Sequence, residues 1–388
     1  MLGLWIIVAC TLISILGYSI TPDATPYAND QKPELHILAP GTTIKILSVK
    51  KNEVKKPVSF FEKMFFGEKA DDDTYSVFSF RFHADSIYAE EFTGNQPNKG
   101  ETLIFNIVDV VYALAPNTPI LYDAVNNTCT FEELGAGKPQ TISVKTLQEK
   151  ITASCIKDKK FLLGTDLLGR DLLSRLMIGT RISLTVGLIS VIISIVIGIF
   201  LGALAGYFRG RMDDAIMWLI NVVWSIPTLL LVIAITLVLG KGITQVFIAV
   251  GLTMWVEVAR IVRGQVISIR EKEFVEAGRA LGYGNGRIIF RHVLPNVLGP
   301  VVVIAAGNFA SAILTEAGLS FLGLGAQPPI PSWGEMTNAH HGYILMDKAY
   351  LAFIPGIAIM ILVLAFMLVG NGLRDAMDTR AVDGKPIE

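Results

Sequence analysis

The sequence has little charge for its length, and this scarcity restricts the class of protein. Only 17% of the 388 residues are charged, whereas 52% are hydrophobic, and the mean hydropathy is +0.53. Because soluble domains carry about 25% charged residues, this composition excludes an ordinary soluble protein. The net charge of −1 also gives no bulk field that would attract nucleic acid. The sequence is therefore typical of an integral membrane protein.

Cysteines and phosphate-binding glycine motifs are scarce as well. The three cysteines, Cys10, Cys129 and Cys155, do not have the spacing of a metal site. Cys129 and Cys155 share the long polar region, where they could form a disulfide if it is extracytoplasmic, or remain free buried thiols. GAGK at 135–138 is followed by Pro139 instead of Ser or Thr, so it is not a phosphate-binding loop. We expect no cofactor on this chain, and ATP would have to be bound by a partner.

Long apolar runs are present and predict an all-α, multi-pass membrane protein with about six transmembrane helices. Residues 2–20 carry no charge and are long enough to cross a hydrocarbon layer of about 30 Å. No basic segment precedes them, so an uncleaved span is preferred to a signal peptide. Each later run must be helical, because in lipid a segment satisfies its own backbone hydrogen bonds. These runs are 182–206, 214–239, 243–262, 297–318 and 350–373.

The polar region between the first two spans predicts a small inserted α+β domain. It contains alternating segments such as SFRFH at 79–83, separated by turn sequences such as TGNQPNKG at 93–100. Just before the second span, charges four residues apart among leucines predict an amphipathic interfacial helix. The predicted divisions are transmembrane helix 1 at 1–21, the insert at 22–160, the interfacial segment at 161–181, the membrane core at 182–375 and a tail at 376–388.

Proline and glycine positions predict how the spans bend and pack. Pro227 and Pro355 lie inside apolar runs and predict kinks. Small residues in the second span allow close helix contact. They are Gly187, Gly198, Gly202 and Gly206.

The distribution of basic residues predicts the orientation. The loop between spans five and six holds only Lys348, whereas the loop after span four is rich in arginine. The positive-inside rule places the latter loop in the cytoplasm, so six spans put both termini in the cytoplasm and the insert outside. The basic residues of the loop after span four are Arg263, Arg270, Lys272, Arg279, Arg287 and Arg291.

The cytoplasmic loop carries the most specific pattern in the chain, EFVEAGRALGYGNGRIIFRHVLPNVLGP at 273–300. Helix-forming residues run up to Gly282, where a glycine can supply the left-handed residue that ends a helix. A second helical piece begins near Arg287 and meets Pro295. The loop therefore predicts a helix-turn-helix exposed at the membrane face.

This spacing resembles the EAA loop of binding-protein-dependent ABC importer permeases. Glu276, Ala277, Gly282, Leu294 and Pro295 match that pattern in register, whereas Gly278 replaces an alanine and His292 replaces an isoleucine. Together with LGTDLLGRDLLSR, RHVLPNVLGP and TEAGLSFLGLGAQPPIPSWGEM, the loop is similar to the C-type permease subunit of the dipeptide/oligopeptide/nickel family. The resemblance covers about 161–380 and the first span.

The resemblance implies a type I importer permease fold in the bacterial inner membrane and transport by alternating access. It implies a second permease subunit, two cytoplasmic ATPases that hold ATP and Mg²⁺, and an extracytoplasmic binding protein. The EAA loop (264–297) would couple to an ATPase through Glu276, Ala277, Gly278, Gly282, Leu294 and Pro295. Peptides are the favoured cargo, with nickel or another small solute as an alternative. Two alternative hypotheses come from other classes of protein: a membrane-anchored receptor or scaffold and, ranked last, an intramembrane enzyme.

Several residues within and between the spans are further candidates. Glu316, Pro227 and Asn308 could line the pathway or pair helices, because polar groups at that depth are costly. Glu257 and Arg260, one helical turn apart, are expected to pair with each other. His340 and His341 are weak metal candidates, because adjacent histidines without further ligands usually make surface contacts.

Overall fold

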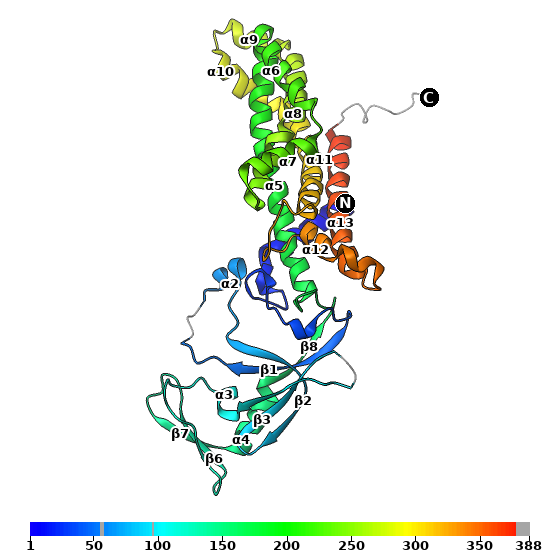
Figure 1. Ribbon diagram of the computed structural model, residues 1–388. Helices are drawn as coiled ribbons and strands as arrows, with labels where there is room; N and C mark the ends of the chain where they lie inside the picture. Colours follow the sequence, from blue (N-terminus) through cyan, green and yellow to red (C-terminus); the bar gives the residue numbers. More distant parts are fainter. Residues whose placement is uncertain (55–57, 95–96, 378–388) are drawn as a thin grey trace, which may run out of the picture. The chain divides into compact units, whose positions relative to one another are not determined.

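The computed structural model describes residues 1–54, 58–94 and 97–377, and the chain forms two compact units (Figure 1). One consists of Met1–Ile15 together with the chain from Ile178 onward, and we call it the membrane unit. The other consists of Leu16–Met177, and we call it the polar unit. All but the first two residues of the predicted tail at 376–388 lie outside the described residues.

Five described helices are long and apolar enough to cross a membrane. The predicted runs at 182–206, 243–262, 297–318 and 350–373 fall within them, and the run at 2–20 is helical over Leu2–Ser19. A sixth candidate arises if one bent pair of helices is counted as a single span. The helices are α1 (Leu2–Leu16), α5 (Leu172–Phe208), α8 (Ile243–Arg270), α11 (Leu294–Phe321) and α13 (Tyr350–Met377).

The predicted span at 214–239 is not one kinked helix. It is divided into α6 (Gly210–Trp224) and α7 (Thr228–Leu239), which are bent by 90° relative to each other. Pro227 is the residue that precedes α7, with a non-helical ψ of 124°. A proline disfavours helical geometry in the residue before it, which explains why α6 stops short of Pro227. Pro355, by contrast, lies inside α13 without interrupting it.

The glycines of α5 pack as predicted. A Cβ atom added to Gly198 would lie 2.5 Å from the Cβ of Val258, and one added to Gly202 would lie 2.5 Å from the carbonyl oxygen of Ala259. One added to Gly206 would lie 2.8 Å from the Cβ of Val266, which is also on α8. The glycines of α5 and the residues of α8 that they contact both repeat every four residues. The backbones of α5 and α8 therefore approach along a continuous seam.

Shorter helices complete the membrane unit. At one end of the bundle, α9 (Glu273–Ala280) and α10 (Asn285–Ile288) precede a π-helical turn (Ile289–Val293) that leads into α11 (Figure 1). Between α11 and α13 lie α12 (Trp333–His340) and a 3₁₀ helix (His341–Leu345).

The polar unit contains two antiparallel sheets, so it has the strands and helices of an α+β domain. The larger sheet has the order β4-β3-β2-β1-β8, and the smaller has the order β5-β6-β7. In the larger sheet the strands are β1 (Thr42–Lys50), β2 (Asp72–His83), β3 (Ser86–Glu91), β4 (Thr102–Asn106) and β8 (Ile156–Phe161). In the smaller they are β5 (Leu121–Asp123), β6 (Thr128–Glu132) and β7 (Pro139–Ser143). The main helices are α2 (Phe60–Phe66), α3 (Ile107–Val111) and α4 (Val144–Lys150).

Cys129 and Cys155 are free thiols, so the disulfide that the sequence allowed is not formed. Both belong to the same hydrophobic core, which also contains Leu47, Ile87 and Phe131. Burial raises the pKa of both thiols. They therefore act as small apolar groups of the core.

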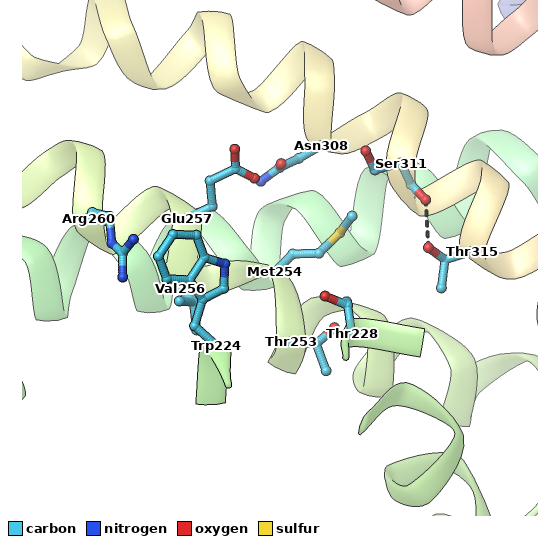
Figure 2. Close-up of a pocket in the computed structure, with 10 residues that line it drawn as sticks. All are labelled: Trp224, Thr228, Thr253, Met254, Val256, Glu257, Arg260, Asn308, Ser311 and Thr315. Carbon is cyan, nitrogen blue, oxygen red and sulfur yellow. Dashed lines mark hydrogen bonds between the residues drawn. The ribbon is translucent and has the colours of Figure 1, made fainter. Parts of the chain in front are cut away.

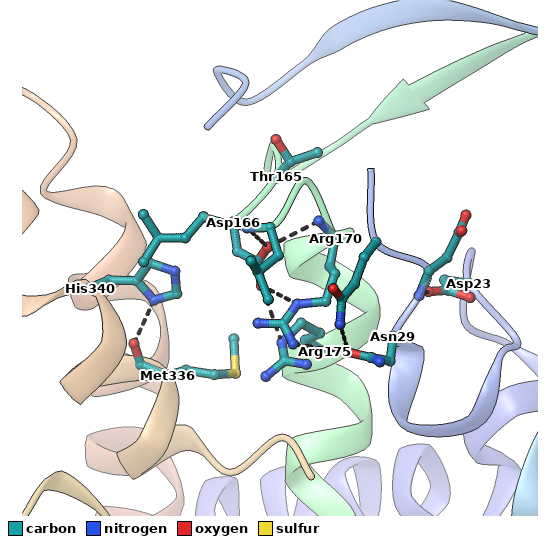
Figure 3. A network of polar contacts seen from close by, with 12 residues as sticks. Asp23, Asn29, Thr165, Asp166, Arg170, Arg175, Met336 and His340 are labelled. Atoms are coloured by element: carbon teal, nitrogen blue, oxygen red, sulfur yellow. Dashed lines mark hydrogen bonds and ion pairs between the residues drawn. The ribbon is translucent and has the colours of Figure 1, made fainter. Parts of the chain in front are cut away.

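The segment at 161–181 is not an amphipathic interfacial helix, because α5 begins only at Leu172. Within the polar unit, the buried Asp166 accepts a hydrogen bond from Arg170 Nε at 2.7 Å, and Arg175 Nε lies 3.5 Å from the same oxygen (Figure 3). Asp166 Oδ1 also accepts from the main-chain N of Leu168 at 2.9 Å. A short polar side chain bonded to the following backbone favours a turn over a helix. The predicted charges thus stabilise a buried turn.

The α5–α8 seam gives the first prediction. Gly202→Ala should lower the melting temperature of the purified protein in detergent, because overpacking costs about 1–3 kcal/mol. Gly264→Ala on α8 is the matched control, since its added methyl would meet no atom within 4 Å. Equal melting temperatures for the two variants would contradict the seam.

Candidate functional site

The helix α9 ends at the predicted glycine with a complete capping motif. Gly282 has a φ of +78°, in the left-handed region. The main-chain N of Tyr283 donates to the carbonyl of Gly278 at 3.0 Å, and that of Gly282 donates to Arg279 at 2.9 Å. This pair of bonds is the Schellman motif, which satisfies carbonyls that a helix end would leave free. The predicted glycine stop is therefore confirmed.

One face of α9 is anchored to the membrane helices. Val275 is fully buried in a cluster with Val262 and Val266 of α8 and Ile288 of α10. Tyr207, at the end of α5, donates its hydroxyl to Asn285 Oδ1 at 2.9 Å. The loop is thus fixed to two long helices, and a force on α9 would be transmitted to both.

The other face of α9 is exposed and combines apolar groups with a carboxylate. Phe274, Ala277 and Leu281 are three and four residues apart, so they form one stripe on the helix. Phe274 is 45% exposed and Leu281 is 70% exposed. Glu276 is also exposed. We call Phe274, Glu276, Ala277 and Leu281 the α9 surface.

The two departures from the family pattern lie beside each other around Tyr283. A methyl group at Gly278 would be 3.5 Å from the Tyr283 ring, which is ordinary contact, so alanine would fit. The His292 ring stacks on Tyr283, with centroids 5.8 Å apart and planes 17° apart. Leu294 and Pro295 open α11, where a proline in the first turn costs no hydrogen bond.

A second site is a cavity of about 410 Å³ in the membrane unit (Figure 2). It lies among α8, α11 and the ends of α6 and α7 that meet at the 90° break. Seven of the ten lining residues have polar side chains, and six of these form two rows at helical spacing on α8 and α11. The lining residues are Trp224, Thr228, Thr253, Met254, Val256, Glu257, Arg260, Asn308, Ser311 and Thr315.

The predicted pairing of Glu257 with Arg260 is wrong. The Arg260 guanidinium lies 3.5 Å from the centre of the Trp224 ring, and its Nη2 is 3.4 Å from Asn221 Oδ1. Glu257 is exposed. Asn308 is only 4% exposed, and within the described residues its Nδ2 has no hydrogen-bond partner. The sequence predicted only a structural ion pair between Glu257 and Arg260, and it gave no indication of the contact with Trp224. The spacing of Thr253, Glu257 and Arg260 does, however, mark one polar face of α8.

The remaining candidates lie elsewhere. Glu316 is 1% exposed, does not line the cavity, and accepts a hydrogen bond from Ser320 at 2.7 Å. It is buried where α12 packs on α11, since a Cβ at Gly334 would be 2.5 Å from the carbonyl of Ala317. Pro227 lies at the break beside the cavity-lining Thr228.

The two histidines contact main-chain carbonyls. His340 is buried, with Nδ1 2.6 Å from the oxygen of Met336, and His341 is exposed, with Nδ1 2.5 Å from the oxygen of Asn338. Across residues 1–54, 58–94 and 97–377, no three metal-ligating side chains come together. Each ring thus contacts the backbone of its own helical turn.

The fold and the two sites define a class: a multi-pass helical membrane protein with a polar cavity between its helices and an exposed helix at one end of the bundle. Residues 198–383 match the family described as binding-protein-dependent transport system inner membrane component. Together with the relatives described next, this match shows that the chain belongs to that family, as the EAA-like spacing predicted. Its members are transport subunits rather than enzymes, and they work with ATPases and a substrate-binding protein.

Three curated relatives are similar to this chain. The glutathione transport system permease protein GsiD of Pectobacterium atrosepticum is 42% identical over 56% of this chain and 72% of its own length. The dipeptide transport system permease protein DppC of Alkalihalophilus pseudofirmus is 42% identical over 56% and 71%. The di/tripeptide transport system permease protein DppC of Pseudomonas aeruginosa is 45% identical over 57% and 73%. A chain of the MetNI methionine ABC transporter, with a TM-score of 0.44 and 20% identity over 53% of this chain and 97% of that chain, is too distant to support an argument.

The cap of α9 gives a second prediction. Gly282→Ala forces a left-handed alanine, which costs about 1 kcal/mol and should speed amide hydrogen exchange in α9 about fivefold. Gly278→Ala should leave that exchange unchanged, because its methyl fits. Exchange mass spectrometry on the two purified variants makes the comparison, and equal rates would show that the cap does not hold α9.

Proposed function

We propose that this chain is one of two permease subunits of an ATP-driven importer and that its cargo is peptides. The exposed α9 surface is the observation that carries the proposal, because it lies on a helix that is rigidly attached to the membrane bundle. An apolar stripe with an adjacent carboxylate suits a groove that presents apolar walls and a basic rim. In this proposal the groove belongs to an ATPase subunit.

The attachment of α9 explains how ATP hydrolysis would reach the membrane. Val275 packs against α8, and Tyr207 connects the loop to α5, so the loop cannot move without these helices. Closure of two ATPases around ATP and Mg²⁺ would shift the α9 surface and with it the bundle. Such a rigid-body shift would change which side of the membrane the cavity opens to.

The proposed orientation follows from the basic residues near α9. We propose that this end of the bundle faces the cytoplasm of a bacterium, because the positive-inside rule favours the cytoplasm for a loop that carries Arg270, Arg279 and Arg287. The termini are then cytoplasmic, and the polar unit lies outside the inner membrane, where a binding protein would deliver cargo. We propose that the second permease subunit is a different chain, as the resemblance to a C-type subunit implies.

The proposal of peptides rests on the relatives and on the cavity. The three relatives are named for glutathione, dipeptide and di/tripeptide transport. The cavity offers a carboxylate, a guanidinium and an amide, which can bond the termini and amide groups of a peptide. Its lining includes one thioether, that of Met254, but neither thiolate nor imidazole, so it does not offer the set of several soft ligands that a metal site needs.

Changing one exposed leucine tests the role of α9. Leu281→Asp should reduce both copurification of the ATPases and substrate uptake at least tenfold, because a charge would be buried in the docked contact. Leu345→Asp is the matched control, since Leu345 is 94% exposed in the 3₁₀ helix after α12. The measurement is pull-down of the ATPases from mild detergent, followed by uptake in proteoliposomes. Full ATPase binding by the Leu281→Asp protein would rule out the α9 surface as the docking site.

A further inference from the structure

We propose that Glu257, Arg260 and Asn308 form a subsite for a zwitterionic peptide within the membrane bundle. The proposal rests on the proposed function and adds the chemistry by which the permease itself would recognise its cargo. The peptide's ammonium group would pair with Glu257, its carboxylate with Arg260, and one of its carbonyl oxygens would accept from Asn308 Nδ2.

The position of these residues argues for a ligand. Glu257 and Asn308 lie near the midpoints of α8 and α11, each a helix of 28 residues. Their side chains extend toward the same cavity from these two helices (Figure 2). An exposed carboxylate at this depth is costly in lipid, so it requires water or a cation. The cavity supplies the space for both.

Asn308 provides an independent observation. It is 4% exposed, lines the cavity, and has no partner for its Nδ2 among the described residues. A buried donor left without a partner costs about 1–3 kcal/mol. A ligand carbonyl in the cavity would satisfy it.

Arg260 is held in a fixed place by Trp224. The guanidinium stacks on the indole ring, which leaves its edge available for the two oxygens of a carboxylate. The volume of about 410 Å³ falls in the range of about 300–1,000 Å³ that is usual for small-molecule sites. A short peptide therefore suits both the size and the charges.

Peptides with blocked ends test the subsite. The intact importer in proteoliposomes, with its binding protein, is given tri-alanine, its N-acetyl form and its C-terminal amide. Glu257→Gln should reduce uptake of tri-alanine at least tenfold relative to the unaltered protein, but leave uptake of the N-acetyl form unchanged. Arg260→Lys should likewise reduce uptake of tri-alanine at least tenfold, but leave uptake of the C-terminal amide unchanged. Because the binding protein is the same throughout, its own preference cancels in each ratio.

The controls separate the possible failures. Asp347→Asn, an exposed residue that lies outside the cavity and just after the 3₁₀ helix His341–Leu345, should leave all three rates unchanged, and ATPase copurification checks assembly of every variant. If Glu257→Gln does not assemble, Glu257→Asp and Asn308→Leu replace it, and tri-alanine uptake should again fall. Equal ratios for all three peptides would overturn the subsite alone. No uptake of any peptide by the unaltered importer would overturn the peptide proposal and the subsite with it.

Discussion

The close approach of α5 and α8 is the contact on which both functional sites depend. Gly198, Gly202 and Gly206 let the valines at 258, 262 and 266 rest on the backbone of α5. This contact fixes the rotation of α8 about its axis. Because the rotation is fixed, Thr253, Glu257 and Arg260 face the cavity, and the valine row continues into the cluster that holds α9.

The same helix connects the two sites. Arg260 and Val266 are six residues apart on α8, which corresponds to about 9 Å along the axis. A movement imposed on α9 would therefore reach Arg260 through a single stiff element. In the proposed mechanism the docking of an ATPase and the contact with cargo act on one helix, so no long pathway of side chains has to be invoked.

Composition and local spacing predicted the parts of the structure that local physics controls. The spans follow from apolar length, the α9 stop follows from one glycine, and the close helix seam follows from glycines four residues apart. The predictions that failed depend on distant partners or on competition between bonds. Arg260 contacts Trp224 of α6 instead of its neighbour on α8, and a four-residue spacing does not reveal a partner on another helix. Asp166 bonds the backbone of its own turn, which overrides the helical charge pattern. The 90° break at Pro227 exceeds the kink that a proline alone predicts, and α6 and α7 each pack against α8.

The two thiols of the polar unit have a consequence for how the protein matures. Cys129 and Cys155 contribute to the hydrophobic core without a covalent link. The core therefore reaches its final packing without an oxidant or a disulfide isomerase. A domain of this kind can complete folding as soon as its strands are free to pair, at a rate set by chain collapse and strand pairing.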